Sequence, residues 1–129
     1  MQIRNSLVCN GLKLTKLETR ADFESKEIGT FDCGFEDLND FFKNDAYENK
    51  KMLFSETYSV HLDQPDTPEI VALISFSNDC VTKNKTVAKH LKNKDIPHST
   101  MRYKSYPAVK ITRFGVKKKY QGQDLGTYI

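Results

Sequence analysis

The C-terminal end of the chain has residue types and spacing that could bind a phosphate group. The segment Gln121-Gly-Gln-Asp-Leu-Gly126 follows three lysines, Lys117–Lys119, and precedes Thr127, where we expect a helix to begin. A turn that opens a helix directs several backbone N–H groups at one point, and such groups bind anions. The sequence therefore predicts an anion site in this turn, although an ordinary strand-to-helix turn is the alternative.

The segment before the turn is expected to be the strand that positions it. Residues 109–116 place Val109, Ile111 and Arg113 on one face and Lys110 with its alternate neighbours on the other. Such alternation is typical of a strand that is half buried and can offer its backbone to a ligand.

A helix is predicted over residues 35–47 because apolar side chains recur there at helical spacing. These positions are Phe35, Leu38, Phe41, Phe42 and Ala46. Acidic residues in the first turn and Lys50 and Lys51 beyond the last one complement the helix dipole. The apolar stripe is expected to face the core.

The remaining segments predict a sheet. Weak alternation at residues 12–17 and clear alternation at 57–62 indicate strands, and 69–77 is a buried apolar strand. Prolines at 64–68 predict the turn of an antiparallel hairpin. Residues 83–106 read as a polar, basic connection with a short helix at 87–91.

The order of these elements predicts one α/β (α+β) domain over residues 1–129. We expect a mostly antiparallel mixed sheet flanked by helices. Residues 70–76 and 109–116 are expected to be its central strands, because both carry apolar, β-branched side chains.

Composition narrows the function classes. The chain has 129 residues and a net charge of +3, but residues 1–82 carry fifteen acids against eight bases, and residues 83–129 carry twelve bases against two acids. The basic part favours a polyanionic ligand, either nucleic acid or a phosphorylated cofactor.

Three widely spaced cysteines indicate free thiols in a cytoplasmic protein. We expect no metal site, no secretory signal and no membrane partner.

The sequence resembles the GNAT superfamily of acetyl-CoA-dependent N-acetyltransferases, whose hallmark is a strand, then Arg/Gln-x-x-Gly-x-Gly/Ala, then a helix. Gln121 and Gly126 fill the first and last positions of that frame, and Asp124 replaces the middle glycine. Phe31-Asp-Cys-Gly-Phe-Glu-Asp-Leu-Asn-Asp-Phe-Phe42 resembles a phrase of a bacterial subgroup close to acetyltransferase toxins. The resemblance implies a GNAT-like fold that is C-terminally incomplete, because the family continues with further strands and helices.

The resemblance also implies a site for acetyl-CoA as co-substrate. The turn would hold the pyrophosphate, and the pantetheine arm would lie along the preceding strand, with Gly115 at the family's bulge or simply at a strand end. The implied cofactor-binding residues are Phe114, Gly115, Val116, Gln121, Gly122, Gln123, Asp124, Leu125, Gly126 and Thr127. No catalytic residue can be assigned.

Asp124 departs from the family pattern, because a carboxylate and a Cβ both oppose a pyrophosphate there. The alternative is that Asp124 caps a helix beginning at Leu125.

We therefore expect an N-acetyltransferase acting on a primary amine, small or macromolecular, with this chain an inactive N-terminal fragment. The subgroup adds tRNA and an antitoxin as partners, and a homodimer as an assembly. The alternatives are a non-catalytic CoA-binding module and a basic nucleic-acid-binding module.

Overall fold

A computed structural model describes residues 11–62, 69–82, 89 and 104–125. The chain divides into two compact units, residues 1–77 with 111–129, and residues 78–110. The first unit contains the helices, most of the sheet and the predicted anion turn. Three predicted features lie wholly or mostly outside the described residues: the turn at 64–68, the short helix at 87–91, of which only the helical Lys89 is described, and the end of the site at Gly126 and Thr127.

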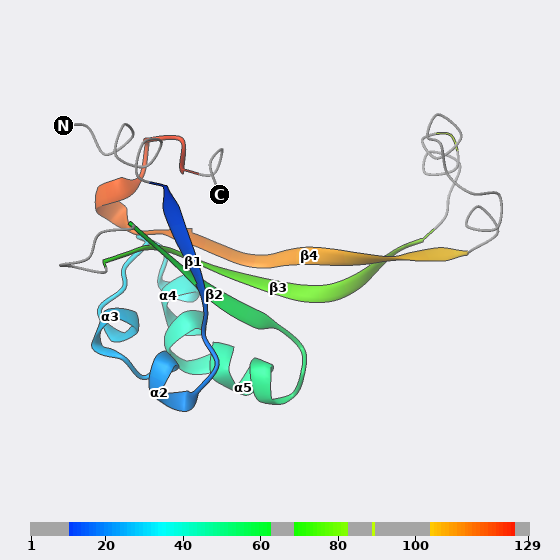
Figure 1. Ribbon diagram of the computed structural model, residues 1–129, viewed down its shortest axis with the longest axis horizontal. Helices are drawn as coiled ribbons and strands as arrows, with labels where there is room; N and C mark the ends of the chain where they lie inside the picture. Colours follow the sequence, from blue (N-terminus) through cyan, green and yellow to red (C-terminus); the bar gives the residue numbers. More distant parts are fainter. Residues whose placement is uncertain (1–10, 63–68, 83–88, 90–103, 126–129) are drawn as a thin grey trace. The chain divides into compact units, whose positions relative to one another are not determined.

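The described strands form one sheet in the order β1-β2-β3-β4. These strands are β1 (Leu12–Lys16), β2 (Glu56–Leu62), β3 (Ile70–Thr82) and β4 (Ser105–Val116). The β1–β2 and β2–β3 pairs are antiparallel. The expected antiparallel sheet is confirmed, and both predicted strands of the hairpin are present (Figure 1).

Two hydrogen bonds show that β3 and β4 are also antiparallel neighbours. Thr112 Oγ1 donates to the Ser75 carbonyl at 3.2 Å, and Lys117 N donates to the Val71 carbonyl at 2.8 Å. The residue number rises from 112 to 117 toward the end of β4 while its partner's number falls from 75 to 71 along β3, so the two strands run in opposite directions. This pairing brings the end of β4, and therefore the turn after it, beside the start of β3.

β3 is the central strand that the sequence predicts. Every residue from Ile70 to Ser75 is buried, so this part of β3 is covered on both faces. The prediction that β4 is also central is wrong for the described sheet, where β4 lies at the edge. Val109 and Ile111 are accordingly 69% and 59% exposed. An apolar, β-branched composition suits a half-exposed edge as well as a buried centre, which is why the pattern did not separate the two.

Two short helices follow β1, and the sequence analysis missed both. The helix α2 (Arg20–Phe23) begins with a capping box, in which Thr19 and Asp22 accept hydrogen bonds from each other's backbone N–H. The helix α3 (Lys26–Gly29) begins at Ser25, whose hydroxyl accepts from the Ile28 N–H at 3.4 Å. Each helix has four residues, too few for an apolar period to appear.

The predicted long helix is present but is interrupted by a wider turn. It comprises α4 (Glu36–Asp40), a π-helical turn η1 (Phe41–Asp45) and α5 (Ala46–Lys51). Phe42 and Ala46 are buried as expected. Phe35 precedes the first turn and is 66% exposed, so its assignment to the buried stripe is wrong.

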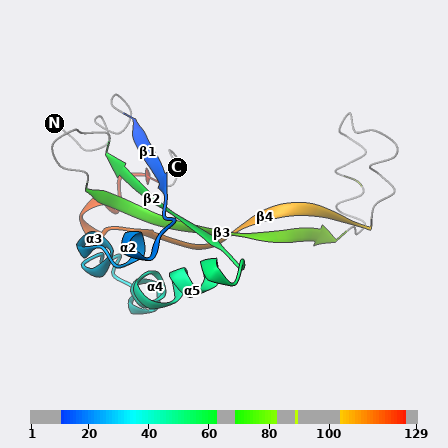
Figure 2. The same ribbon diagram turned by 60° about the horizontal axis from the view of Figure 1, so that its bottom comes forward.

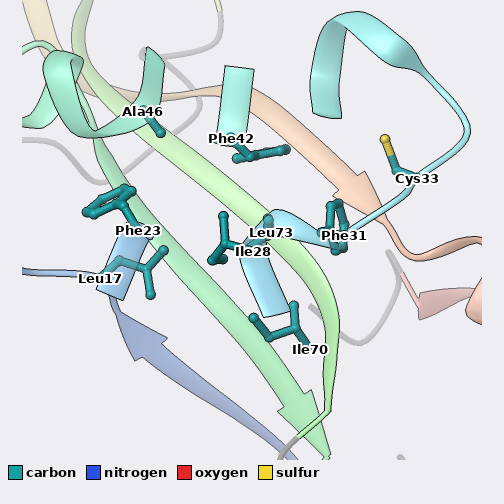
Figure 3. Packing of buried hydrophobic residues seen from close by; sticks show 9 residues of the cluster. All are labelled: Leu17, Phe23, Ile28, Phe31, Cys33, Phe42, Ala46, Ile70 and Leu73. Atoms are coloured by element: carbon teal, nitrogen blue, oxygen red, sulfur yellow. The ribbon is translucent and has the colours of Figure 1, made fainter. Parts of the chain in front are cut away.

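The helices α2 to α5 all lie on one face of the sheet (Figures 1 and 2). The side chains buried between helices and sheet form one cluster, in which the Phe31 and Phe42 rings meet edge to face with their centroids 6.1 Å apart. Figure 3 shows its members: Leu17, Phe23, Ile28, Phe31, Cys33, Phe42, Ala46, Ile70 and Leu73. Burying each large side chain contributes about 1.5–3 kcal/mol, so this cluster fixes the helices on β3.

A second cluster contains the residues around the predicted anion turn. Val60, Val71 and Ile74 pack there with Tyr120 and Leu125, which are 2% and 3% exposed. Tyr120 ends the 3₁₀ turn η3 (Lys118–Tyr120) just before the predicted turn, and Leu125 is the last described residue of that turn. The turn is therefore held at both ends by buried side chains.

Candidate functional site

The end of β4 lies unusually close to the loop that precedes α4. A Cβ added at Gly115 would lie 3.3 Å from both Cβ and Sγ of Cys33 and 3.5 Å from the Phe42 ring. Cys33 is 1% exposed, so this loop cannot move aside without disturbing the core. Gly115 is thus required for close packing here. Whether it also marks a bulge stays a prediction.

The loop itself is fixed by hydrogen bonds between its own polar groups. The Asn39 side-chain oxygen accepts from the Cys33 N–H at 3.0 Å, and its Nδ2 donates to Asp32 at 3.0 Å. Asp32 also accepts from the Gly34 N–H at 2.8 Å. These bonds, led by the one from Asn39, hold the pKa of the Asp32 carboxyl below its usual range. The first part of the phrase that carried the resemblance, residues 31–35, is therefore a hydrogen-bonded loop beside β4, and the rest of the phrase forms α4 and the start of η1.

Four of the ten predicted cofactor residues line one pocket of about 220 Å³ between this loop and β4. They are Phe114, Gly115, Val116 and Gln121. The opposite wall is formed by Cys33, Phe35 and Leu38. The exposure of Phe35 that contradicted the core prediction is thus explained, because its side chain borders this pocket.

Gln121 connects the turn to both walls of the pocket. Its side-chain Nε2 donates to the Cys33 carbonyl at 2.5 Å and to the Val116 carbonyl at 2.8 Å. The first residue of the predicted frame therefore positions the turn through its side chain.

The turn after Gln121 has the backbone of a glycine-rich anion loop. Gly122 has φ +79° and nothing within 4 Å of its missing Cβ, so its backbone is open to a ligand. Asp124 has φ +57°, a left-handed conformation in which glycine is the least strained residue. This is the position at which the family frame has glycine. Gln123 lies between them, and Leu125 can reach a ligand only through its backbone because its side chain is buried.

Leu125 is the first helical residue after the turn, so Asp124 occupies the position that the N-cap interpretation gives it, although its φ differs from the extended backbone typical of N-cap residues. Asp tolerates the left-handed region better than most residues, because its short polar side chain bonds locally.

Three basic residues next to the turn are paired with carboxylates. Lys117 Nζ and Lys119 Nζ each lie 2.9 Å from Glu69 Oε1, and Lys118 Nζ lies 3.6 Å from Asp32. Tyr120 donates its hydroxyl hydrogen to the other Glu69 oxygen at 2.5 Å. Each of the three lysines before the predicted anion turn is therefore paired with a carboxylate of the protein itself.

Glu69 is held as a carboxylate by these donors. Burial acts to raise the pKa of Glu69, but the hydrogen bonds from Tyr120, Lys119 and Lys117 outweigh it and lower the pKa from 4.5 to about 2. The pKa of the Tyr120 hydroxyl is raised by burial and by Glu69, so it stays a donor. Glu69 thus anchors η3, and with it the start of the turn, beside β3.

We expect Glu69→Gln to lower the free energy of unfolding at pH 7 by about 1 kcal/mol, after allowing for screening of a side chain that is 30% exposed. The folded pKa lies below the unfolded one, so the contribution is complete above pH 4.5 and is lost as the pH falls toward 2. Urea denaturation at pH 7, 5 and 3 checks this.

The exposed Glu18→Gln variant is the control for that experiment, and it should match the original chain at each pH. An equal deficit of Glu69→Gln at pH 7 and pH 3 would contradict the role given to the charge.

Sequence reasoning missed Glu69 and Cys33 as neighbours of the site. Glu69 is 48 residues from Lys117, and nothing local connects them. Cys33 lies within the phrase that carried the resemblance, and that was the only available signal. The described residues contain no group of three or more side chains that could hold a metal ion.

Comparison with solved structures finds the same arrangement of elements in bacterial toxins. A Tyr-to-Phe mutant of KacT superimposes with a TM-score of 0.63 and 23% identity, covering 90% of this chain and 62% of that one. AtaTR bound with acetyl-CoA gives 0.61 and 25% identity, with the same coverages. The chain has the fold of the GNAT toxin acetyltransferases.

A third GNAT neighbour is AtaT complexed with acetyl-methionyl-tRNAfMet, at a TM-score of 0.62, 21% identity and again 90% and 62% coverage. The chain therefore spans about three-fifths of the length of these GNAT structures. Other neighbours include AtaT bound to the C-terminus of the antitoxin AtaR with acetyl-CoA, and a KacTA–DNA complex. No protein-family model and no curated protein matches the chain.

The GNAT likeness confirms the fold expected from the resemblance, and two of the neighbouring structures contain acetyl-CoA. The ten predicted site residues stay a prediction. Among the described helices, none is long and apolar enough to cross a membrane.

Proposed function

We propose that this chain is the acetyl-CoA-binding part of an N-acetyltransferase that transfers acetyl to a primary amine. The observation that carries the proposal is the turn after β4. Gly122 and Asp124 have positive φ, and Gln121 fixes the turn to the end of β4. A diphosphate fits such a turn, because its backbone N–H groups are not hidden by a side chain at Gly122.

The adjoining pocket supports a position for the rest of the cofactor. An extended pantetheine arm would pair its amides with the backbone of Phe114–Val116, as an added strand does. That backbone lies at the edge of the described sheet. The pocket of about 220 Å³ at Gly115 would then receive the thioester end.

The acceptor we propose is the amino group of an aminoacyl-tRNA, and the binding partner an antitoxin protein. Both proposals come from neighbours, since AtaT is complexed with acetyl-methionyl-tRNAfMet in one structure and with the AtaR C-terminus in another. A homodimer stays a prediction.

We further propose that residues 1–129 alone bind CoA without turnover. Residues 109–116 contain no carboxylate that could act as a base. The hydroxyl of Tyr120 belongs to a buried side chain and is bonded to Glu69, so it is not available as a proton donor for a leaving thiolate.

Calorimetric titration tests the cofactor site. CoA should bind saturably, and pantetheine, which lacks the nucleotide diphosphate, should bind at least tenfold more weakly. Equal binding of the two would place the anion contacts elsewhere, and no binding of CoA would overturn the proposal.

A second assay tests turnover. Free thiol release from acetyl-CoA, measured with polyamines and aminoacyl-tRNA as acceptors, should not exceed the protein-free rate. Robust release would contradict the absence of turnover while leaving the cofactor site in place.

The alternative of a basic nucleic-acid-binding module stays a prediction, and the pairing of the lysines before the turn weighs against their use as phosphate contacts. Three of the twelve basic residues after residue 82 are Lys117, Lys118 and Lys119, which are paired with Glu69 and Asp32. Counterion release from a polyanion requires bases that are free to pair with phosphate.

A further inference from the structure

A second and larger pocket, of about 380 Å³, lies between the C-terminal part of the long helix and β4. Its polar lining includes Asp45 and Glu48 from the helix, Ser55 from the segment before β2, Ser77 from β3 and Arg113 from β4. None of these residues belongs to the predicted cofactor site.

Ser55 is the first indication that this pocket receives a ligand. The residue is only 8% exposed, and its hydroxyl has no hydrogen-bond partner among the described residues. Buried hydroxyls are almost always paired, because an unpaired one loses its bonds to water without replacement. Here the residue that carries the unpaired hydroxyl lines a pocket large enough for a small molecule.

The position of Ser55 is built into the fold. Asn49 accepts hydrogen bonds at its carbonyl from the Phe54 N–H at 2.8 Å and the Ser55 N–H at 3.4 Å. The Asn49 side chain in turn donates to the Asp45 carbonyl at 2.9 Å. The segment that carries Ser55 is therefore tied back onto the helix that carries Asp45.

The charges in the pocket favour a cation. Asp45 has no ion-pair partner in the described part of the chain, whereas Glu48 is paired with Lys51 at 3.4 Å. The positive group, Arg113, is already engaged, since its guanidinium lies 5.0 Å from the centre of the Phe41 ring and donates to the Thr112 carbonyl at 2.9 Å. An incoming ammonium group would find one free carboxylate and one free hydroxyl.

The two pockets lie on the same face of β4. Arg113 and Gly115 are two residues apart, about 7 Å along a strand, and both side-chain positions face the helices. On the helical side, Phe41 borders the larger pocket and Leu38 the smaller one, about one turn apart. The π-helical turn begins at Phe41, and such turns are frequent at functional sites.

We propose that the larger pocket binds the amino group of the acceptor, a primary amine in its protonated form. The ammonium group lies against Asp45, and one of its N–H bonds is donated to Ser55 Oγ. This inference rests on the proposed function, since the amine must meet the thioester at the neighbouring pocket. It assigns Asp45 and Ser55 as acceptor-binding residues and Arg113 as the group that closes the pocket over Phe41.

NMR titration of the whole chain in the absence of CoA tests the pocket. The probe is n-propylamine, and N-propylacetamide serves as the uncharged comparison. The amine should shift the amide signals of Asn49, Ser55 and Ser77, and the amide compound should not. Equal shifts with both compounds, or no shift at these residues, would overturn the proposal.

Paired variants separate binding from folding. Asp45→Asn should weaken propylamine binding about tenfold or more, and Ser55→Ala about threefold or more. Ser55→Ala should leave the thermal midpoint unchanged or raised, because it removes an unpaired buried hydroxyl. The controls are Glu36→Gln, an acid outside the pocket, and Ser59→Ala, a buried serine already bonded to Thr15.

Retained binding in both Asp45→Asn and Ser55→Ala would overturn the assignment. CoA titration of the same samples keeps this result distinct from the proposed function. Amine binding by a chain that does not bind CoA would uphold the pocket and refute the acetyltransferase, and the reverse result would refute only the pocket.

Discussion

Asp124→Gly is expected to bind CoA about threefold to a hundredfold more tightly than the original chain. A carboxylate about 6 Å from a phosphate charge costs roughly 0.7–3 kcal/mol at an effective dielectric between 80 and 20, before screening by salt. That energy corresponds to the stated range of dissociation constants. The backbone favours the change, because φ is +57° at this position and glycine adopts it without strain.

Calorimetric titration at low and high salt measures this effect. The advantage of the Gly variant should shrink as salt is raised, because the removed term is electrostatic. Asp124→Asn is the matched control: it removes the charge, keeps the Cβ and tolerates the same left-handed backbone. Asn should recover most of the gain if charge dominates, and little of it if the Cβ dominates.

Weaker binding by both variants would mean that the Asp124 carboxylate holds the turn in place. Unchanged binding by both would mean that the turn is not the phosphate site.

Gly115→Ala is expected to lower the free energy of unfolding by about 1–3 kcal/mol, the usual cost of overpacking. The new Cβ would meet Cys33 Cβ and Sγ at 3.3 Å and the Phe42 ring at 3.5 Å. All three atoms belong to buried side chains of the helix-side core, so none can give way freely. Chemical denaturation checks the value, and CoA binding should fall as well, since Gly115 lines the smaller pocket.

Two further variants interpret that result. Gly29→Ala is the control, because Gly29 lies in α3 with nothing within 4 Å of the added Cβ, and it should be neutral or stabilising. Cys33→Ala combined with Gly115→Ala should recover part of the loss by removing Sγ. A Gly115→Ala chain as stable as the original would show that the loop yields, and that the close approach is not required.

Elements long enough to show a repeating apolar pattern could be predicted from the sequence, and shorter elements could not. Alternation predicts β2, and helical spacing predicts a helix over residues 35–47, which the structure shows at 36–51. The helices α2 and α3 depend on caps at Thr19 and Ser25, and four residues carry no period. The edge position of β4 depends on which strands pair, and composition does not encode that.

Only the part of the candidate site that forms a short continuous segment could be predicted from the sequence. The turn at residues 121–125 could be found because glycine and a strand-to-helix transition leave a short motif. Its support is distant, because Glu69 pairs with Lys117 across 48 residues. The second pocket is equally non-local, since Ser55 and Arg113 line it together only when β2, β3 and β4 are assembled. Charge counting also shows only that Lys117–Lys119 belong to a basic part of the chain, and not that the fold pairs all three with carboxylates.

The two hydrogen bonds of the Gln121 side chain close a ring through three segments: the loop at Cys33, the end of β4 at Val116, and the turn itself. One of these bonds spans 88 residues of sequence. The orientation of the turn is consequently inherited from the N-terminal half of the chain. Substitutions at residues 32–39 are therefore expected to change the affinity for the cofactor, even when residues 114–127 are unchanged. The two stretches are expected to evolve as one unit, with a change at Asp32 or Asn39 tolerated only alongside a compensating change near Gln121.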